Sequence, residues 1–208
     1  MDLPIYSKSY SLEYNYDIFT ILNQSNLIIQ HNNKSSTLKI CDSQGKVIGC
    51  IFKCYVYKLF DSIFFKLLIY NNQNQVVLMI KQSFNQVISV YIPSKHDDVY
   101  FKQIGKVDFN LRNYKLYTEK HPFAEINLIP QTKEFPIVDE KNFTLGCVDL
   151  KWLKKIDFNA YNVRFDLSRE LKTRILYENF KSNMDFFQRA VFLSTAISID
   201  FGSFLRRD

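Results

Sequence analysis

Residues 37–53 read TLKICDSQGKVIGCIFK, and this pattern of strand, turn and strand decides the fold. Two further stretches repeat the pattern: residues 66–82 read KLLIYNNQNQVVLMIKQ, and residues 135–151 read FPIVDEKNFTLGCVDLK. In each unit two apolar segments flank a polar centre, which is typical of a β-hairpin. The repetition indicates one repeated β-meander rather than three unrelated loops.

The turns of the three units share their chemistry. Each turn opens on a residue whose short side chain can accept backbone hydrogen bonds, and three positions later comes a residue that tolerates a positive φ angle. These pairs are Asp42 with Gly45, Asn71 with Asn74, and Asp139 with Asn142. We therefore expect the same tight turn three times.

Further short apolar or alternating runs occupy much of the remaining chain. They are residues 17–22, 26–30, 54–60, 88–93, 99–107, 114–118 and 123–129. Together with the hairpins they predict about a dozen strands with short connections. This number and spacing indicate a mainly β protein, either a closed barrel or a sandwich, and closure is the simplest way to remove exposed strand edges.

Composition predicts one globular domain. The chain has 208 residues, of which 47% are hydrophobic and 16% aromatic, so disordered and collagen-like classes are excluded. No linker divides it. Residues 1–14 contain no apolar core of signal-peptide length, and we expect a cytoplasmic protein in which they form an N-terminal extension.

The net charge of +6 favours polyanionic partners, such as an anionic membrane surface or nucleic acid. The densest basic positions surround Trp152 or lie at the C-terminal end. They are the candidate lipid- or anion-binding residues, namely Lys151, Lys154, Lys155, Arg206 and Arg207. A solvated surface is the alternative explanation for both groups.

Catalytic and metal-binding patterns are missing from the sequence. The four cysteines form no CxxC pair, so free thiols are expected rather than disulfides or a zinc site. The three histidines stand in polar, turn-like stretches without an HExxH, GxSxG or P-loop pattern. We expect a protein that is not an enzyme and that needs no cofactor.

Helical signal is confined to the C-terminal part of the chain. Ser168 can cap an amphipathic helix over residues 168–180. From Ala190 to Ile199 the chain carries no charge, and apolar residues point in every direction, as in a helix buried on all sides. This run is shorter than the roughly 20 residues that a bilayer requires. A helix at about residues 184–204 inside the protein is therefore favoured over a membrane span.

Three consecutive motifs resemble the phospholipid scramblase family, and more broadly the tubby C-terminal-like fold shared with tubby proteins and plant LURP-one-related proteins. The motifs are GCVDLKW at 146–152, DFNAYNVRF at 157–165 and AVFLSTAISIDF at 190–201. Their order and endings agree with the family pattern over roughly residues 15 to 204.

The resemblance implies a closed barrel of about twelve strands, formed by residues 15–208, that encloses the hydrophobic C-terminal helix. It implies a buried helix core made of Phe186, Val191, Phe192, Leu193, Ile197 and Ile199. It also implies scramblase-like binding to anionic phospholipid at the cytosolic face of a membrane, with a link to transbilayer phospholipid movement.

The chain departs from the scramblase pattern in ways that bear on function. It lacks the Pro-rich N-terminal segment and the cysteine cluster that carries lipid anchors. The calcium loop implied by the family would use Asp157, Asn159 and Asp166, but Asn162 and Ser168 stand where an EF-hand needs Gly and Glu. These departures favour the alternative of a non-catalytic protein-interaction module, such as an assembly subunit or a pathogen effector. Nucleic-acid binding is a third, weaker hypothesis.

Overall fold

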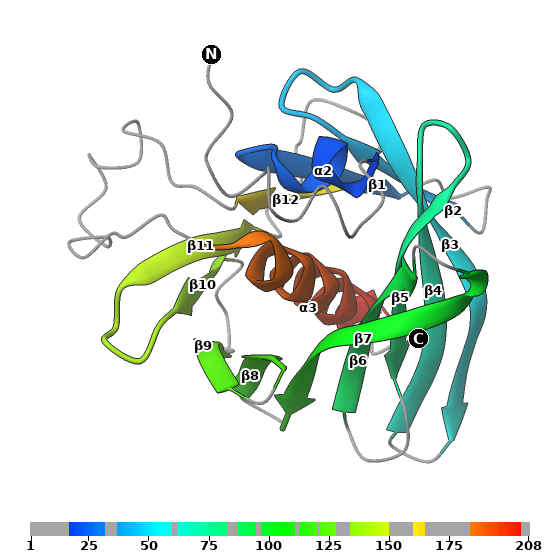
Figure 1. The fold of residues 1–208 in the computed structure, drawn as a ribbon. Helices are drawn as coiled ribbons and strands as arrows, with labels where there is room; N and C mark the ends of the chain where they lie inside the picture. The colour runs from blue at the N-terminus through cyan, green and yellow to red at the C-terminus, as the bar shows by residue number, and fades with distance from the viewer. Residues whose placement is uncertain are drawn as a thin grey trace.

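Twelve antiparallel strands close into a barrel in a computed structural model, which describes residues 17–31, 37–59, 62–82, 87–94, 97–110, 113–119, 121–127, 134–149, 160–164 and 184–204. The strands are β1 (Asn26–His31), β2 (Thr37–Cys41), β3 (Val47–Leu59), β4 (Ser62–Asn71), β5 (Val76–Gln82), β6 (Val87–Ser94), β7 (Asp97–Phe109), β8 (Asn113–Thr118), β9 (His121–Asn127), β10 (Glu134–Val138), β11 (Thr144–Asp149) and β12 (Ala160–Arg164). Each strand pairs with its neighbours in sequence, and β12 returns to pair with β1 (Figure 1).

The three hairpin turns have the predicted geometry. Asp42 Oδ1 accepts hydrogen bonds from the backbone N–H groups of Gln44 and Lys46, both at 2.9 Å. Asn71 and Asp139 make the corresponding pairs of bonds in their own turns. The residues three positions later all have positive φ angles: 83° at Gly45, 61° at Asn74 and 61° at Asn142. The expectation of one tight turn used three times is confirmed.

Each of these hairpins also contains a bulge beside its turn. The register shifts between Ile40 and Cys41, between Ile69 and Tyr70, and between Ile137 and Val138. A tight turn closed by a residue with positive φ is commonly accompanied by a bulge of this kind. Because the bulge increases local twist, three such hairpins help the sheet curve into a barrel.

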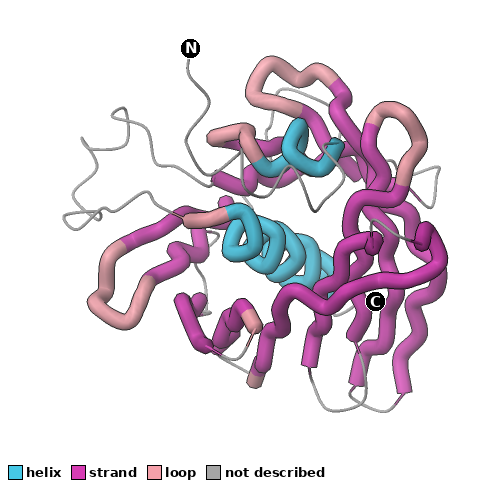
Figure 2. The backbone as a smooth tube through the Cα atoms, viewed as in Figure 1, coloured by secondary structure: helices cyan, strands magenta, loops and turns pink. Residues whose placement is uncertain are grey.

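Two helices lie against the inner side of the barrel. Helix α3 (Phe186–Phe204) runs through the interior and packs mainly on β7 and β8 (Figure 1). Helix α2 (Asp17–Leu22) packs on β3, β4 and β5 and also contacts α3. Figure 2 shows the long helix surrounded by strands. The predicted fold, a mainly β barrel that encloses a hydrophobic C-terminal helix, is confirmed.

The prediction of a strand at residues 17–22 is wrong, because this segment forms helix α2. Ile18, Ile21 and Leu22 are buried, and their spacing of three and four residues places them on one helical face. Six residues are too few for the hydrophobic period of a helix or of a strand to be distinguished. Contact with the barrel interior therefore decides the conformation.

Side-chain hydrogen bonds define the start of helix α3 and satisfy buried hydroxyl groups along it. Asp185 Oδ1 accepts a hydrogen bond from the N–H of Gln188, and Gln188 Oε1 accepts one from the N–H of Asp185, which is a reciprocal capping box. Along the helix, the hydroxyl groups of Ser194, Thr195 and Ser198 each donate to the carbonyl four residues earlier. These bonds remove the cost of burying a hydroxyl group without a partner.

The side chains predicted to form the helix core are all buried. Their exposed fractions are 9% at Phe186, 0% at Val191, 0% at Phe192, 1% at Leu193, 0% at Ile197 and 3% at Ile199.

Two glycines let α3 approach the wall of the barrel. A Cβ atom on Gly105 in β7 would stand 2.3 Å from Val191 Cγ2, and one on Gly146 in β11 would stand 2.9 Å from Phe192 Cε1. Both distances are too short for non-bonded carbon atoms. Glycine at these positions therefore sets how closely helix and sheet can pack.

Candidate functional site

The sequence-predicted binding residues lie outside the described part of the chain. This applies to the basic candidates Lys151, Lys154, Lys155, Arg206 and Arg207, and to the calcium-loop candidates Asp157, Asn159 and Asp166. It also applies to the N-terminal extension at 1–14 and to the predicted helix at 168–180. These predictions stay as they were, and the candidate site described below comes from other residues.

A row of residues that are basic or aromatic, with one serine, crosses the outer face of the barrel from β3 to β8. The strand register places its members directly opposite one another on successive strands: Tyr55, Lys66, Lys81, Ser89, Lys106 and Tyr117. We call this set the lysine row. Adjacent strands lie about 4.8 Å apart, so Lys66 and Lys81 are about 5 Å apart at the backbone and Lys106 lies about 10 Å beyond Lys81.

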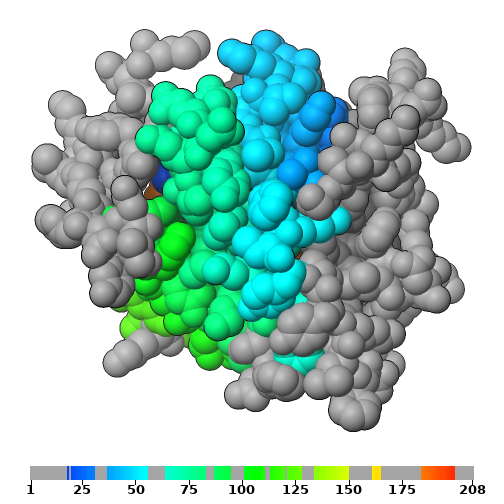
Figure 3. Space-filling model, turned by 90° about the vertical axis from the view of Figure 1, so that its right-hand side faces the viewer, coloured from blue at the N-terminus to red at the C-terminus, as the bar shows by residue number. Residues whose placement is uncertain are grey.

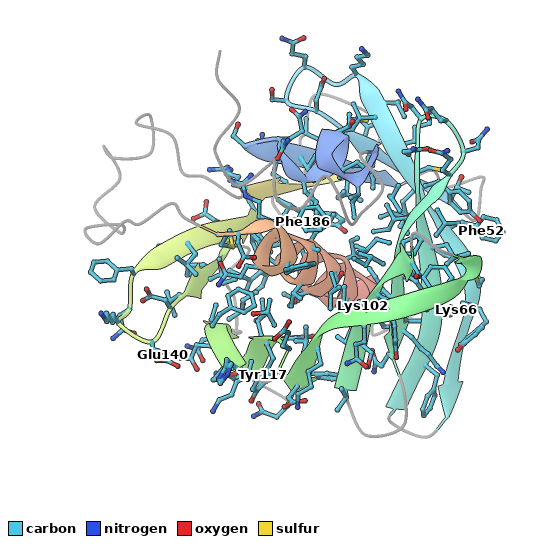
Figure 4. The ribbon with its side chains drawn as sticks, in the orientation of Figure 1. Phe52, Lys66, Lys102, Tyr117, Glu140 and Phe186 are labelled. Atoms are coloured by element: carbon cyan, nitrogen blue, oxygen red, sulfur yellow. The ribbon has the colours of Figure 1, made fainter. Side chains whose placement is uncertain are left out.

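Burial shows that the lysine row faces outward. Along β4, the half-buried Lys66 is followed by Leu67, which has no exposed surface, and on β5 the exposed Lys81 follows the equally buried Ile80. Since successive side chains of a strand point to opposite faces, the lysines must point away from the core. Figure 4 shows Phe52 and Lys66 on the outer side of the barrel wall.

The central lysines of the row carry uncompensated charge. Neither Lys66 nor Lys81 has a carboxylate partner among the residues that the structure describes. Like charges directly opposite each other on neighbouring strands destabilise a sheet. A nearby anionic group would remove this cost, so the pair is suited to an anionic ligand.

Lys106 is held in place by its neighbours. Its Nζ atom lies 3.0 Å from Asp108 Oδ2 and 4.5 Å from the centre of the Tyr117 ring. The side chains of Lys106 and Asp108 are 37% and 38% exposed. Such an ion pair in contact with solvent contributes little to stability, but it restricts the position of the ammonium group.

A second row, mostly apolar, runs beside the lysine row, two residues away along β4, β5 and β6 and three residues away along β3. Its members, opposite one another from β3 to β6, are Phe52, Leu68, Met79 and Tyr91. We call this set the apolar row. Two residues along a strand span about 7 Å, so the two rows lie side by side. Phe52 is exposed, Leu68 and Tyr91 are half-buried, and Met79 is buried. Figure 3 looks onto this face, where β3 is cyan, β4 and β5 are teal and the strands that follow are green.

The four cysteine thiols differ in their exposure to solvent. Cys41 and Cys147 are buried, Cys50 is half-buried, and Cys54 is exposed. Burial raises the pKa of the thiols of Cys41 and Cys50, which keeps them protonated where an exposed thiol begins to ionise. Cys54 lies on β3 beside both rows and is the exposed thiol of this face.

Two further features of the described ranges bear on the chemistry of the site. No three His, Cys, Asp or Glu side chains come together there in a group that could hold a metal ion. Within the same ranges, no helix is both long enough and apolar enough to cross a membrane.

Sequence reasoning missed the lysine row because its members are far apart in the chain. One signal was available: Lys66 and Lys81 are the first residue and the second-last residue of the second repeated unit, so a correctly folded hairpin must bring them together. Adding Lys106 required the register of two more strands, β6 and β7, which no local pattern provides.

No family model and no curated protein matches this chain. Among solved structures, it is similar to a protein from Arabidopsis thaliana determined by X-ray crystallography, with a TM-score of 0.51 and 10% sequence identity, over 84% of this chain and 91% of that one. The likeness and the closed barrel together support a tubby-like fold. Membership of the scramblase family stays a prediction.

Proposed function

We propose that this tubby-like barrel binds anionic phospholipid membranes peripherally, and that the lysine row is the surface that meets the lipid phosphates. The observation that carries the proposal is the opposed pair Lys66 and Lys81, outward-facing and without carboxylate partners among the described residues. A lysine beside an anionic membrane surface contributes about 1 kcal/mol of binding free energy. The excess of positive charge in the whole chain acts in the same direction.

The adjacent apolar row favours a bilayer over nucleic acid as the polyanion. Single-stranded nucleic acid is held by aromatic rings on which the bases stack. The centre of this row is aliphatic, with the half-buried Leu68 and the buried Met79 between Phe52 and Tyr91. Aliphatic side chains offer no stacking plane, whereas apolar and aromatic side chains beside lysines suit the boundary between headgroups and acyl chains.

Vesicle co-sedimentation tests the proposal. The intact chain is mixed with neutral vesicles or with vesicles rich in acidic phospholipid, at low and at high salt. We expect binding to the acidic vesicles that weakens at high salt, since salt screens exposed charges. Lys66→Gln and Lys81→Gln should each weaken binding about fivefold, which corresponds to the loss of about 1 kcal/mol.

Lys141→Gln is the matched control. It removes the same charge from the β10–β11 turn, and the neighbouring Glu140 lies on the opposite side of the barrel from Phe52 and Lys66 (Figure 4). Binding should change much less than in the lysine-row variants. If Lys141→Gln and Lys66→Gln weaken binding equally, only net charge matters and the lysine row is not the site. A folded chain that binds no acidic vesicles contradicts the proposal altogether.

The scramblase resemblance adds a finer hypothesis, movement of lipid between leaflets. A fluorescent-lipid assay on the same vesicles tests it, because dithionite bleaches only the lipids of the outer leaflet. Bleaching beyond half of the signal in intact vesicles would support lipid movement. Bleaching that stops at half would restrict the function to membrane binding.

The alternative function is a non-catalytic protein-interaction module. The observation that favours it is the exposed apolar surface of β3, since exposed apolar patches also mark protein interfaces. A stable complex with another protein, recovered by pull-down from a chain that binds no vesicles, would select this alternative. Neither function involves bond chemistry, so we propose that the protein is not an enzyme.

A further inference from the structure

The exposed large hydrophobic side chains are concentrated on one strand. Among the residues whose exposure the structure describes, they are Val47 at 47%, Phe52 at 42% and Tyr55 at 38%, and all three belong to β3. Phe52 is a member of the apolar row, and Tyr55 is the end of the lysine row on β3. The strand therefore carries exposed apolar side chains next to Lys66 and Lys81, which have no carboxylate partner in the part of the chain that the structure describes.

A β-bulge brings Phe52 and Tyr55 to the same face. The register of β3 against β4 shifts between Lys53 and Tyr55, which leaves Cys54 as the extra residue. In a regular strand, residues 52 and 55 would point to opposite faces of the sheet. The extra residue reverses the alternation, so that Tyr55 pairs outward with Lys66 while Phe52 pairs outward with Leu68. Cys54 is exposed between them.

We infer that this bulged segment of β3, residues 52–55, is the part of the protein that penetrates the headgroup layer of an anionic bilayer. The inference rests on the proposed function and specifies how the same face engages its partner. Phe52 and Tyr55 enter the interface, where aromatic rings are favoured, while Lys66 and Lys81 contact the phosphates beside them. Charge complementarity and continuity with the lysine row select a lipid surface as the partner of this patch.

Substitutions in the lysine row and at Phe52 or Tyr55 should affect vesicle binding with a different dependence on salt. Burial of apolar surface does not depend on ionic strength in the way that attraction between exposed charges does. We expect Phe52→Ser and Tyr55→Ser each to weaken binding to acidic vesicles about tenfold, by a similar factor at low and at high salt. The effect of Lys66→Gln should shrink as salt rises.

Val47→Ser is the matched control, because Val47 is the most exposed hydrophobic residue among those of β3 whose exposure the structure describes, and it lies beside the β2–β3 turn, away from the bulge at Cys54. Its substitution should leave binding unchanged. Urea unfolding of each variant checks that the fold is retained. If Val47→Ser weakens binding as much as Phe52→Ser, the apolar contact is not localised at the bulge and the inference is overturned.

The thiol of Cys54 gives a second, independent measurement on the unaltered chain. Alkylation followed by peptide mass spectrometry measures its reactivity separately from that of the buried Cys41 and the half-buried Cys50. We expect Cys54 to be alkylated first in solution and to be protected when acidic vesicles are added, but not when neutral vesicles or inorganic phosphate are added.

The outcomes separate this inference from the proposed function. If vesicles bind and the lysine variants weaken binding, but Cys54 is not protected and Phe52→Ser has no effect, the membrane function holds and penetration by residues 52–55 is wrong. If no vesicles bind, both fail. If Cys54 becomes protected without lipid as the protein concentration rises, a second copy of the chain covers the patch, which also overturns the inference.

Discussion

At the residue scale, three side-chain oxygens make the repeated turns possible. Asp42, Asn71 and Asp139 each use one Oδ1 atom to accept two backbone N–H groups that the sheet does not pair. Because Asn serves at one position and Asp at two, we expect the acceptor oxygen, and not the charge, to stabilise the turn. This equivalence gives a direct test.

Asp139→Ala should lower the free energy of unfolding by about 1–2 kcal/mol, because the N–H groups of Lys141 and Phe143 lose their shared acceptor. Asp139→Asn keeps the oxygen and should stay within about 0.5 kcal/mol of the parent chain. Urea unfolding monitored by circular dichroism measures both. Equal losses in the two variants would show that charge, and not hydrogen bonding, stabilises the turn.

Gly105 offers a second test at this scale. A methyl group there would meet Val191 Cγ2 at 2.3 Å and the carbonyl oxygen of Tyr117 at 2.5 Å, so Gly105→Ala should destabilise the protein by about 1–3 kcal/mol. Adding Val191→Ala removes the first clash, and the double variant should lose less than the sum of the two single losses. Additive losses in thermal unfolding would mean that Gly105 and α3 are not in contact.

At the element scale, helix α2 is too short to be stable by itself. Helices of fewer than about 12 residues are marginal in water, and α2 has six. It depends on the interior contacts of Ile18, Ile21 and Leu22 and on Arg189 of α3. Arg189 Nη1 donates to the carbonyl oxygens of Leu22 at 2.9 Å and Gln24 at 3.4 Å, where a cation also interacts favourably with the helix end.

Arg189→Met should therefore release α2 from the barrel, since two carbonyl groups lose a charged donor at a cost of about 1–3 kcal/mol. In the Arg189→Met variant we expect amide hydrogen exchange to become faster in residues 17–24 than it is in the parent chain. Exchange in the barrel strands should stay unchanged. Arg189→Lys keeps the positive charge and should recover part of the protection. The account is wrong if exchange at residues 17–24 is unchanged while exchange in the strands increases.

At the scale of the whole molecule, α3 is the core around which the barrel closes. Phe192 has no exposed surface and reaches the wall of the barrel at Gly146. Phe192→Ala should destabilise the protein by about 3–5 kcal/mol, as expected for a fully buried aromatic residue. Phe192→Leu keeps most of the apolar volume and should cost clearly less. Chemical denaturation measures both, and a loss below about 1 kcal/mol in the alanine variant would contradict an interior location.

The sequence by itself determined the repeated hairpins, their turn chemistry and the buried character of the C-terminal helix. These features are local, because a turn is set by four or five consecutive residues and burial on all sides can be read from ten uncharged ones. The order of three terminal motifs suggested the barrel, and the strand pairing confirmed it.

Only the tertiary structure decided the conformation of residues 17–22 and the composition of the outer face. A six-residue apolar segment takes the conformation that its surroundings favour. The lysine row exists only when five strand pairs have their particular register, and a shift of one residue would turn its side chains inward. The bulge at Cys54 adds Tyr55 to this row, and strand pairing, not sequence period, sets that bulge.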